Sequence, residues 1–188
     1  NNIIGQNEVS PEVWIKSAFK ELHKIFESFE GSMLISLIFG LIEESSGLIY
    51  YINAEHPWMI LYRDNVASFI ESDSHFRKLG TTGIKNEIFV NTFQMLPGDL
   101  MIMGSDGKDD VVLEWNKEGG ERVINEDETL FLKRVEESKG NLEAIYEAIV
   151  DKFDLMDDLS LLSISFQGET ESEKKNKDDI HNIIHKAS

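Results

Sequence analysis

Two short acidic segments carry the side chains best suited to chemistry. Ser105-Asp106-Gly107 directly follows the apolar run 100–103, and Asp157-Asp158 directly precedes the apolar run 159–166. A buried strand that ends on Asp-Gly places a carboxylate at a sheet edge, where a hard cation can be held. If the two runs are neighbouring strands, their acidic ends can share magnesium or manganese. A pair of such ions can hold a hydroxide and phosphate oxygens together, so that no protein nucleophile is needed.

Each segment also has a simpler interpretation on its own. An Asp-Gly after a strand is usually an ordinary turn, and the same holds for Asp157-Asp158. A calcium loop of the EF-hand type is excluded, because the sixth position counted from Asp106 is Val111, where that loop needs glycine.

Other polar residues are weaker candidates. His56, within Asn53-Ala54-Glu55-His56-Pro57, could be a ligand or a base, although a single histidine at a strand break is more often a structural hydrogen-bonding group. His181 and His185 stand four residues apart, but the glutamate of a zinc-protease motif is missing. Ser105 has no plausible His-Asp partner in the sequence, which argues against a serine triad.

A long helix is expected near the start of the chain. Ser10 is a suitable N-cap and Pro11 suits the first helical position. Apolar residues then recur at spacings of four and three, which predicts one buried face: Ile15, Phe19, Leu22, Phe26 and Phe29. His23 lies off this face and is expected to be solvated, and Glu30-Gly31 should end the helix.

A run of antiparallel strands should follow, then helices, then a returning strand. The expected strands are 32–42, 48–52, 58–62, 66–70, 88–93, 100–103 and 159–166. The expected helical stretches are 109–115, 130–135 and 142–153, the last capped by Asn141. A type II turn at Leu96-Pro97-Gly98-Asp99 leads into 100–103, and 116–127 reads as a loop. This order predicts an α+β fold, an antiparallel β-sandwich flanked by helices.

Composition excludes several classes of function. The 188 residues suit one domain, and their net charge of -17 disfavours nucleic acid and anionic membranes as partners. The chain has no cysteine, which excludes disulfides and thiolate zinc sites and fits a reducing compartment. No apolar run reaches the roughly 18 residues of a membrane span, so no membrane contact is expected from this segment.

Five motifs in one order resemble the metal-dependent protein phosphatase (protein phosphatase 2C-type) family, in its bacterial sporulation and stress-response, SpoIIE-like branch. They are the Asn53 to Trp58 segment after a Gly-Leu-Ile-Tyr-Tyr strand, Lys78-Leu79-Gly80, Leu96 to Asp99, Ser105 to Gly107, and Asp157-Asp158-Leu-Ser-Leu-Leu162. The similarity covers residues 10–166.

This resemblance implies a phosphatase that uses two Mn²⁺ or Mg²⁺ ions and metal-activated water. Asp106 and Asp157 match metal-binding aspartates of the family, and Asp158 matches a position that is less often a ligand. The implied substrate is phosphoserine or phosphothreonine on a regulatory protein of the anti-sigma-factor antagonist type. A cytoplasmic location follows, and a homodimer is left open.

The chain also departs from the family pattern. Glu55 replaces a glycine, and Ser105 replaces a threonine. The family's earlier metal-binding aspartate and its Asp-x-x-Gly-His-Gly-like motif have no match before Ser10. Residues 1–166 are therefore expected to be a phosphatase domain that lacks its N-terminal portion, with little activity of its own, and 167–188 a charged, flexible tail.

Two other functions remain open from the sequence. A non-catalytic relative could keep the fold as a sensor or protein-interaction module, which the missing motif and Glu55 favour. An acidic interaction domain without phosphate chemistry is the third alternative.

Overall fold

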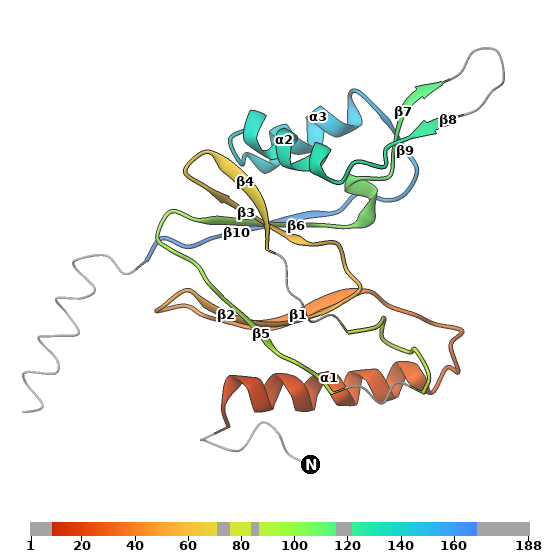
Figure 1. Ribbon diagram of the computed structural model, residues 1–188, viewed down its shortest axis with the longest axis vertical. Helices are drawn as coiled ribbons and strands as arrows, with labels where there is room; N and C mark the ends of the chain where they lie inside the picture. Colours follow the sequence, from red (N-terminus) through yellow and green to blue (C-terminus); the bar gives the residue numbers. More distant parts are fainter. Residues whose placement is uncertain (1–8, 71–75, 84–86, 116–121, 169–188) are drawn as a thin grey trace, which may run out of the picture.

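The computed structural model describes residues 9–70, 76–83, 87–115 and 122–168. A helix, two sheets and a pair of helices are stacked in layers (Figure 1). The first elements are α1 (Pro11–Glu27), β1 (Leu37–Glu43), β2 (Leu48–Ala54), β3 (Met59–Arg63), β4 (Val66–Ile70), β5 (Asn91–Gln94) and β6 (Leu100–Gly104). The later ones are the 3₁₀ turn η2 (Asp106–Lys108), β7 (Val111–Trp115), β8 (Arg122–Ile124), α2 (Thr129–Glu137), α3 (Leu142–Val150), β9 (Asp154–Leu155) and β10 (Leu161–Ser165).

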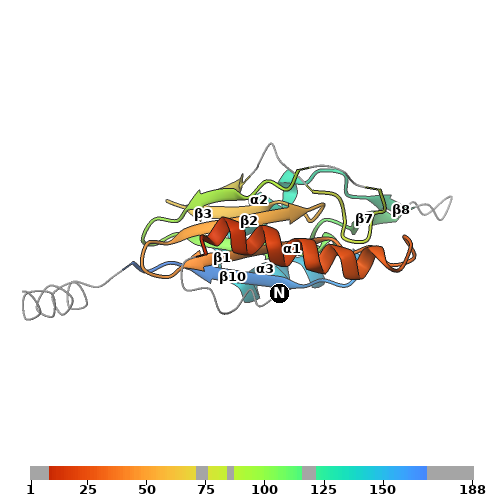
Figure 2. The same cartoon turned by 90° about the horizontal axis from the view of Figure 1, so that it is seen from below.

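Helix α1 begins where the sequence predicts. The Ser10 hydroxyl accepts the N–H of Val13 at 3.4 Å, and Pro11 occupies the first turn. Ile15 and Phe19 are fully buried against the sheet of β1, β2 and β5, which α1 crosses in Figure 2. The prediction that Phe29 belongs to the buried face of the helix was wrong, because the helix ends at Glu27 and Phe29 is 44% exposed.

The solvated position predicted for His23 was also wrong. Both of its ring nitrogens are buried and have no hydrogen-bond partner among the described residues, and the ring meets Phe76 edge-on with ring centroids 5.4 Å apart. Phe76 comes from a segment far along the chain, so a helical-face pattern could not reveal this neighbour.

The two large sheets are antiparallel throughout, which confirms the predicted fold class. One sheet has the order β1-β2-β5 and the other β10-β6-β3-β4. The apolar core between them takes Ile49 and Tyr51 from β2, Met59 from β3 and Met101 from β6. A second core lies between the larger sheet and helices α2 and α3.

The predicted helix over 109–115 was wrong, because Val111–Trp115 form strand β7. β7 pairs with β8 on one side and β9 on the other in a small third sheet. The expected loop 116–127 therefore contains strand β8, while residues 116–121 lie outside the described residues. Val111 and Val112 are buried, and β-branched residues favour strands over helices when sheet partners are present.

Two predictions concern the ends of the chain. Of the expected tail, only Gln167 and Gly168 belong to the described residues, so His181 and His185 lie outside them. Among the helices that the structure describes, none has the length and apolar character needed to cross a membrane.

Candidate active site

Strand β6 delivers Asp106 to the end of a sheet. The predicted turn before it is present, because Gly98 has φ +94° and the Asp99 N–H donates to the Leu96 carbonyl at 3.0 Å. β6 is central in its sheet, with Ile102 fully buried between β3 and β10. The strand ends at Gly104, and Asp106 opens the 3₁₀ turn η2 with an exposed side chain.

The hydroxyl of Ser105 joins the two acidic segments. It donates to the Asp158 carbonyl at 2.8 Å and accepts the Ser160 N–H at 3.0 Å. The Ser105 N–H also donates to the Ser160 carbonyl at 3.0 Å. Strand pairing continues beyond this point, with Gly104 opposite Leu161. The neighbouring arrangement of strands that the sequence only supposed is therefore present.

Gly107 allows this close approach. A Cβ atom at this position would lie 2.5 Å from the Asp158 carbonyl oxygen and 3.1 Å from that of Asp157. The backbones of the two acidic segments are thus in direct contact, and any larger residue would force them apart.

Asp106 and Asp157 carry carboxylate oxygens, the kind of group that Mg²⁺ and Mn²⁺ prefer as ligands. Asp106 accepts the Gly107 N–H at 3.2 Å, and Asp157 accepts the Asp158 N–H at 2.7 Å. Neither carboxylate forms an ion pair within the described residues. Within the described residues, both carboxylates are therefore without a cationic partner. However, no group of three His, Asp or Glu side chains converges among the described residues, so these two aspartates are an incomplete ligand set.

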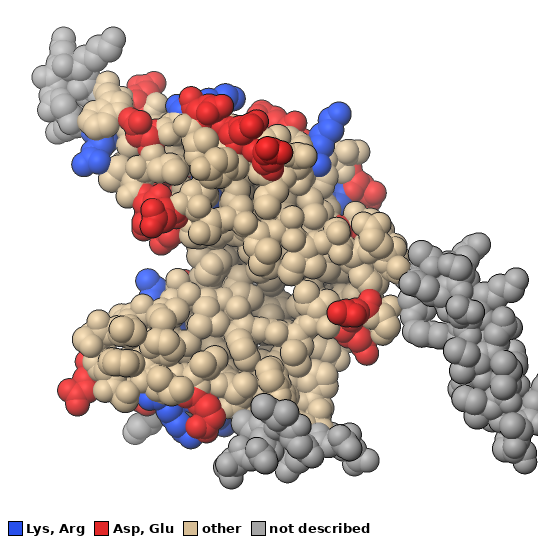
Figure 3. All heavy atoms as spheres, turned by 180° about the vertical axis from the view of Figure 1, so that it is seen from behind, with Lys and Arg blue, Asp and Glu red and all other residues tan. Residues whose placement is uncertain are grey.

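A cavity of about 630 Å³ opens beside Asp106. Figure 3 shows the molecule hollowed between the part that carries α1 and the part that carries α2 and α3. The lining residues are mostly polar: Ser36, Asn53, Glu55, His56, Pro57, Trp58, Phe69, Phe76, Arg77, Lys78, Asp106, Lys108, Asp109, Asp110, Asn125, Glu126 and Glu128. Asp157 is not among them. The cavity therefore has Asp106 on its wall and carries an excess of carboxylates.

A buried charge cluster lies behind Asp106, and sequence reasoning missed it. The Lys108 side chain is only 2% exposed; its ammonium pairs with the Asp109 carboxylate and lies 5.0 Å from the Phe131 ring centroid. Arg134, also buried, donates to the Lys108 carbonyl at 3.1 Å. Burial raises the pKa of Asp109, an effect opposed by Lys108, and burial lowers the pKa of Arg134. The consecutive charges Lys108-Asp109-Asp110 were the available signal, but a charge run usually indicates a solvated surface.

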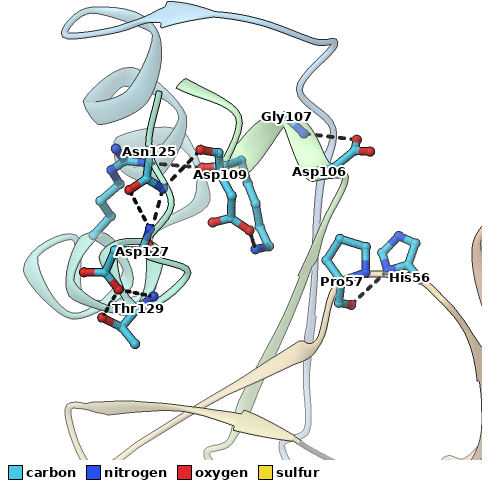
Figure 4. Close-up of polar contacts among 10 residues, drawn as sticks. His56, Pro57, Asp106, Gly107, Asp109, Asn125, Asp127 and Thr129 are labelled. Carbon is cyan, nitrogen blue, oxygen red and sulfur yellow. Dashed lines mark hydrogen bonds and ion pairs between the residues drawn. The ribbon is translucent and has the colours of Figure 1, made fainter. Parts of the chain in front are cut away.

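The turn before α2 forms another wall of the cavity (Figure 4). The Asn125 amide donates to the carbonyls of Asp109 and Asp127 at 3.1 and 3.2 Å. Asp127 accepts the backbone N–H of Thr129 at 2.9 Å and its hydroxyl at 2.5 Å. These two hydrogen bonds lower the pKa of Asp127. The turn is thereby fixed against η2 by side chains from its own residues.

His56 sits in a loop shaped by Asn53. The buried Asn53 side chain accepts the His56 N–H at 2.8 Å and donates to the His56 carbonyl at 3.0 Å. The ring Nδ1 of His56 is 3.0 Å from the Pro57 carbonyl oxygen, as Figure 4 shows. These contacts are of the structural kind that its sequence context favoured, and the residue also lines the cavity. Its neighbour Glu55 has a left-handed backbone, with φ +50°, where glycine is the least strained residue.

One family model matches nearly the whole chain. The model described as stage II sporulation protein E (SpoIIE) matches residues 2–167. A comparison with curated protein sequences finds no match.

Several solved structures share the fold. The RsbU and RsbW domains of Rv1364c from Mycobacterium tuberculosis superpose with a TM-score of 0.62 at 18% identity, over 83% of this chain and 43% of that one. The phosphatase domain of SpoIIE from Bacillus subtilis superposes with a TM-score of 0.54 at 16% identity, over 91% of this chain and 71% of that one. The SiaA-PP2C domain of Pseudomonas aeruginosa superposes with a TM-score of 0.60 at 12% identity, over 83% of this chain and 61% of that one. The chain thus spans less than half of the first of these structures, and at these identities the likeness concerns the fold.

Proposed function

This chain belongs to the SpoIIE family of protein phosphatase 2C-type domains, and on that premise we propose that it is part of a metal-dependent serine/threonine protein phosphatase. The observation that carries the proposal is the contact between the Ser105–Gly107 turn and the Asp157-Asp158 segment at one end of the β6–β10 pair. Asp106, which forms no ion pair within the described residues, lines the cavity of about 630 Å³, and Asp157 belongs to the segment in contact with its turn.

Asp106 and Asp157 are the residues that would hold Mn²⁺ or Mg²⁺, with further ligands needed to complete the site. A bound ion of this kind would supply positive charge for phosphate oxygens and lower the pKa of a coordinated water. Ser105 connects the turn that carries Asp106 to the segment that follows Asp157, because its hydroxyl binds the backbone on each side of Leu159. Asn125 holds the opposite wall against η2 through the Asp109 carbonyl.

The charge of the cavity also supports a bound cation. Six carboxylate side chains line it, against three Lys or Arg side chains. This excess of negative charge weakens the attraction of the cavity for a phosphate dianion, and a cation bound beside Asp106 would strengthen it. The cavity volume lies in the usual range for small-molecule sites, about 300–1,000 Å³, which is ample for a phosphorylated side chain.

We further propose that the substrate is a phosphorylated regulatory protein of the anti-sigma-factor antagonist type, and that the reaction takes place in the cytoplasm. The family resemblance supports the substrate class, and the absence of cysteine fits a reducing compartment. A homodimer stays a prediction that sedimentation of the full-length protein would test.

The test is Mn²⁺-dependent hydrolysis of a phosphoserine protein by the full-length protein that contains this chain. Asp106→Asn and Asp157→Asn should each lower kcat/KM by about 100-fold or more, because losing a metal ligand removes several kcal/mol of charge stabilisation. Asp64→Asn is the matched control: it removes the same charge in an exposed turn at φ +52°, which asparagine tolerates. Equal rates for Asp106→Asn and the control would contradict the proposal.

One observation favours a non-catalytic relative as the second candidate. No three His, Asp or Glu side chains converge in the part of the chain that the structure describes. Titration calorimetry of the full-length protein with MnCl₂ separates the two functions. A sensor or docking module would bind the phosphorylated protein without hydrolysing it, and Asp106→Asn would leave that binding unchanged.

A further inference from the structure

Arg77 and Lys78 form a cationic edge on an otherwise acidic cavity. Both line the cavity that contains Asp106, and both side chains are exposed. The opposite charges come from other elements: Asp106 belongs to η2, and Glu126 and Glu128 precede α2. The chain has 35 acidic and 18 basic residues, so two adjacent basic side chains on the wall of a mostly acidic cavity are unusual.

The backbone that presents these two cations is anchored on both sides. The Phe76 N–H donates to the Asn53 carbonyl at 2.8 Å. Leu79 is fully buried and exchanges two backbone hydrogen bonds with Ile35, at 2.8 and 3.1 Å. Gly80 follows at φ +89°, where a Cβ atom would lie 2.3 Å from the Met33 carbonyl oxygen. Arg77 and Lys78 therefore project from a short segment held in place at each end.

Glu55 forms an ion pair with Arg77. Their carboxylate and guanidinium are 2.8 Å apart, with side-chain exposures of 31% and 66%. Glu55 has φ +50°, a backbone conformation that glycine adopts without strain. An ion pair this exposed adds little stability, so stability does not explain a glutamate here. Lys78 has no ion pair within the described residues.

We propose that Arg77 and Lys78 bind an oxyanion of the protein substrate, either the phosphate that is removed or an acidic side chain beside it. The inference rests on the proposed function and names the recognition device of the same cavity. Arg77 can grip a phosphate or carboxylate with two parallel hydrogen bonds, whereas Lys78 acts as a point charge. Glu55 occupies Arg77 in the free protein and competes with the incoming anion.

The test measures binding without catalysis. Fluorescein-labelled peptides are titrated with the full-length protein in EDTA and followed by fluorescence anisotropy. One peptide carries phosphoserine with neutral flanks, and a second carries serine with glutamate flanks. Arg77→Ala/Lys78→Ala should weaken binding of at least one peptide by about 10-fold, whereas Glu55→Gln should tighten it about 3-fold because Arg77 is released. The peptide that responds identifies the source of the oxyanion.

The control is Lys20→Ala/Lys24→Ala, which removes the same charge from the exposed side of α1. Circular dichroism confirms folding of each variant. If the Arg77/Lys78 variant weakens binding no more than this control, or if neither peptide binds the unaltered protein, the proposal is overturned. Loss of binding in a protein that shows no Mn²⁺-dependent hydrolysis would support the cationic edge and reject the phosphatase. Normal hydrolysis with an unchanged KM in the Arg77/Lys78 variant would support the phosphatase and reject the role of the cationic edge.

Discussion

The ion pair between Arg63 and Asp99 should stabilise the sheet that carries the candidate site. Arg63 donates two hydrogen bonds to Asp99, from Nε at 2.7 Å and from Nη2 at 2.6 Å. Asp99 also accepts the Leu96 N–H at 2.7 Å, and its carbonyl accepts the Phe166 N–H at 3.1 Å. One residue thus ties the start of β6 to β3 and β10, the strands on either side of it.

We expect Asp99→Asn to lower the free energy of unfolding by about 2 kcal/mol. The Asp99 side chain is 2% exposed and the Arg63 side chain 35% exposed. Charge-assisted hydrogen bonds contribute about 1.5–3 kcal/mol, and truncating a fully buried pair costs about 3–5 kcal/mol. Because water can reach part of Arg63, the pair is not fully buried, and the range for charge-assisted hydrogen bonds applies. Asparagine keeps an acceptor oxygen for the Leu96 N–H, but its NH₂ group would face the Nε–H of Arg63, so the effect combines the lost charge with one lost hydrogen bond.

The pH dependence of this effect has a definite sign. The hydrogen bonds from Arg63 are the main reason that the pKa of Asp99 lies below its ordinary value. A carboxyl with a depressed pKa in the folded state stabilises the fold above its unfolded-state pKa of about 3.9. That stabilisation is lost as the pH falls through the lower folded-state pKa. The difference between Asp99→Asn and the unaltered protein should therefore shrink below about pH 4.

Urea denaturation of the full chain, with a double-mutant cycle of Asp99→Asn and Arg63→Gln, measures the pair directly. We expect a coupling energy of about 1–2 kcal/mol at pH 7. A coupling below about 0.5 kcal/mol, the usual limit for independent sites, would refute the reasoning. So would a stability difference for Asp99→Asn that stays constant from pH 7 down to strongly acidic pH.

The other predictions concern the contact between the two acidic segments and the charges behind it. Ser105→Ala should lower stability by about 1–3 kcal/mol through two lost hydrogen bonds, and Ser105→Thr, which keeps the hydroxyl, should recover most of it in thermal unfolding. Gly107→Ala should cost about 1–3 kcal/mol, because its Cβ would meet the Asp158 carbonyl oxygen at 2.5 Å. Calorimetry should show weaker Mn²⁺ binding by Gly107→Ala in the full-length protein, and unchanged binding would argue against the site. Lys108→Met should lower stability by about 3 kcal/mol at pH 7, since it leaves Asp109 buried without its partner. This loss should diminish in chemical denaturation as the pH falls, because burial already raises the pKa of Asp109 and protonation removes its charge.

Local signals in the sequence were sufficient wherever a few neighbouring residues decide the backbone. Ser10-Pro11 starts α1, and Asn141 caps α3 by accepting the Ala144 N–H at 2.9 Å. Gly98 supplies the positive φ of the turn before β6. The position of Asp106 at the end of a buried strand follows from the apolar run before it. Each of these features depends on contacts within about four residues along the chain.

Strand β7 could not be recognised in the same way. Val111–Trp115 is short, and a short apolar run fits a strand or a helix equally well. Its partners are β8 and β9, and β9 lies some forty residues further along the chain, with Val111 opposite Leu155. The choice between strand and helix was therefore made by pairing at long range, although the two valines and the tryptophan were a usable signal.

The acidic turn Ser105-Asp106-Gly107 shows the same division. The sequence determined that Ser105, Asp106 and Gly107 end a buried strand and that Asp157-Asp158 precede another. Only the tertiary structure placed the Ser105 hydroxyl on the Asp158 backbone, buried the Lys108 ammonium and set Arg77 against Glu55. The physical reason is that a side chain's partner across the fold depends on strand order and register, which no local pattern encodes.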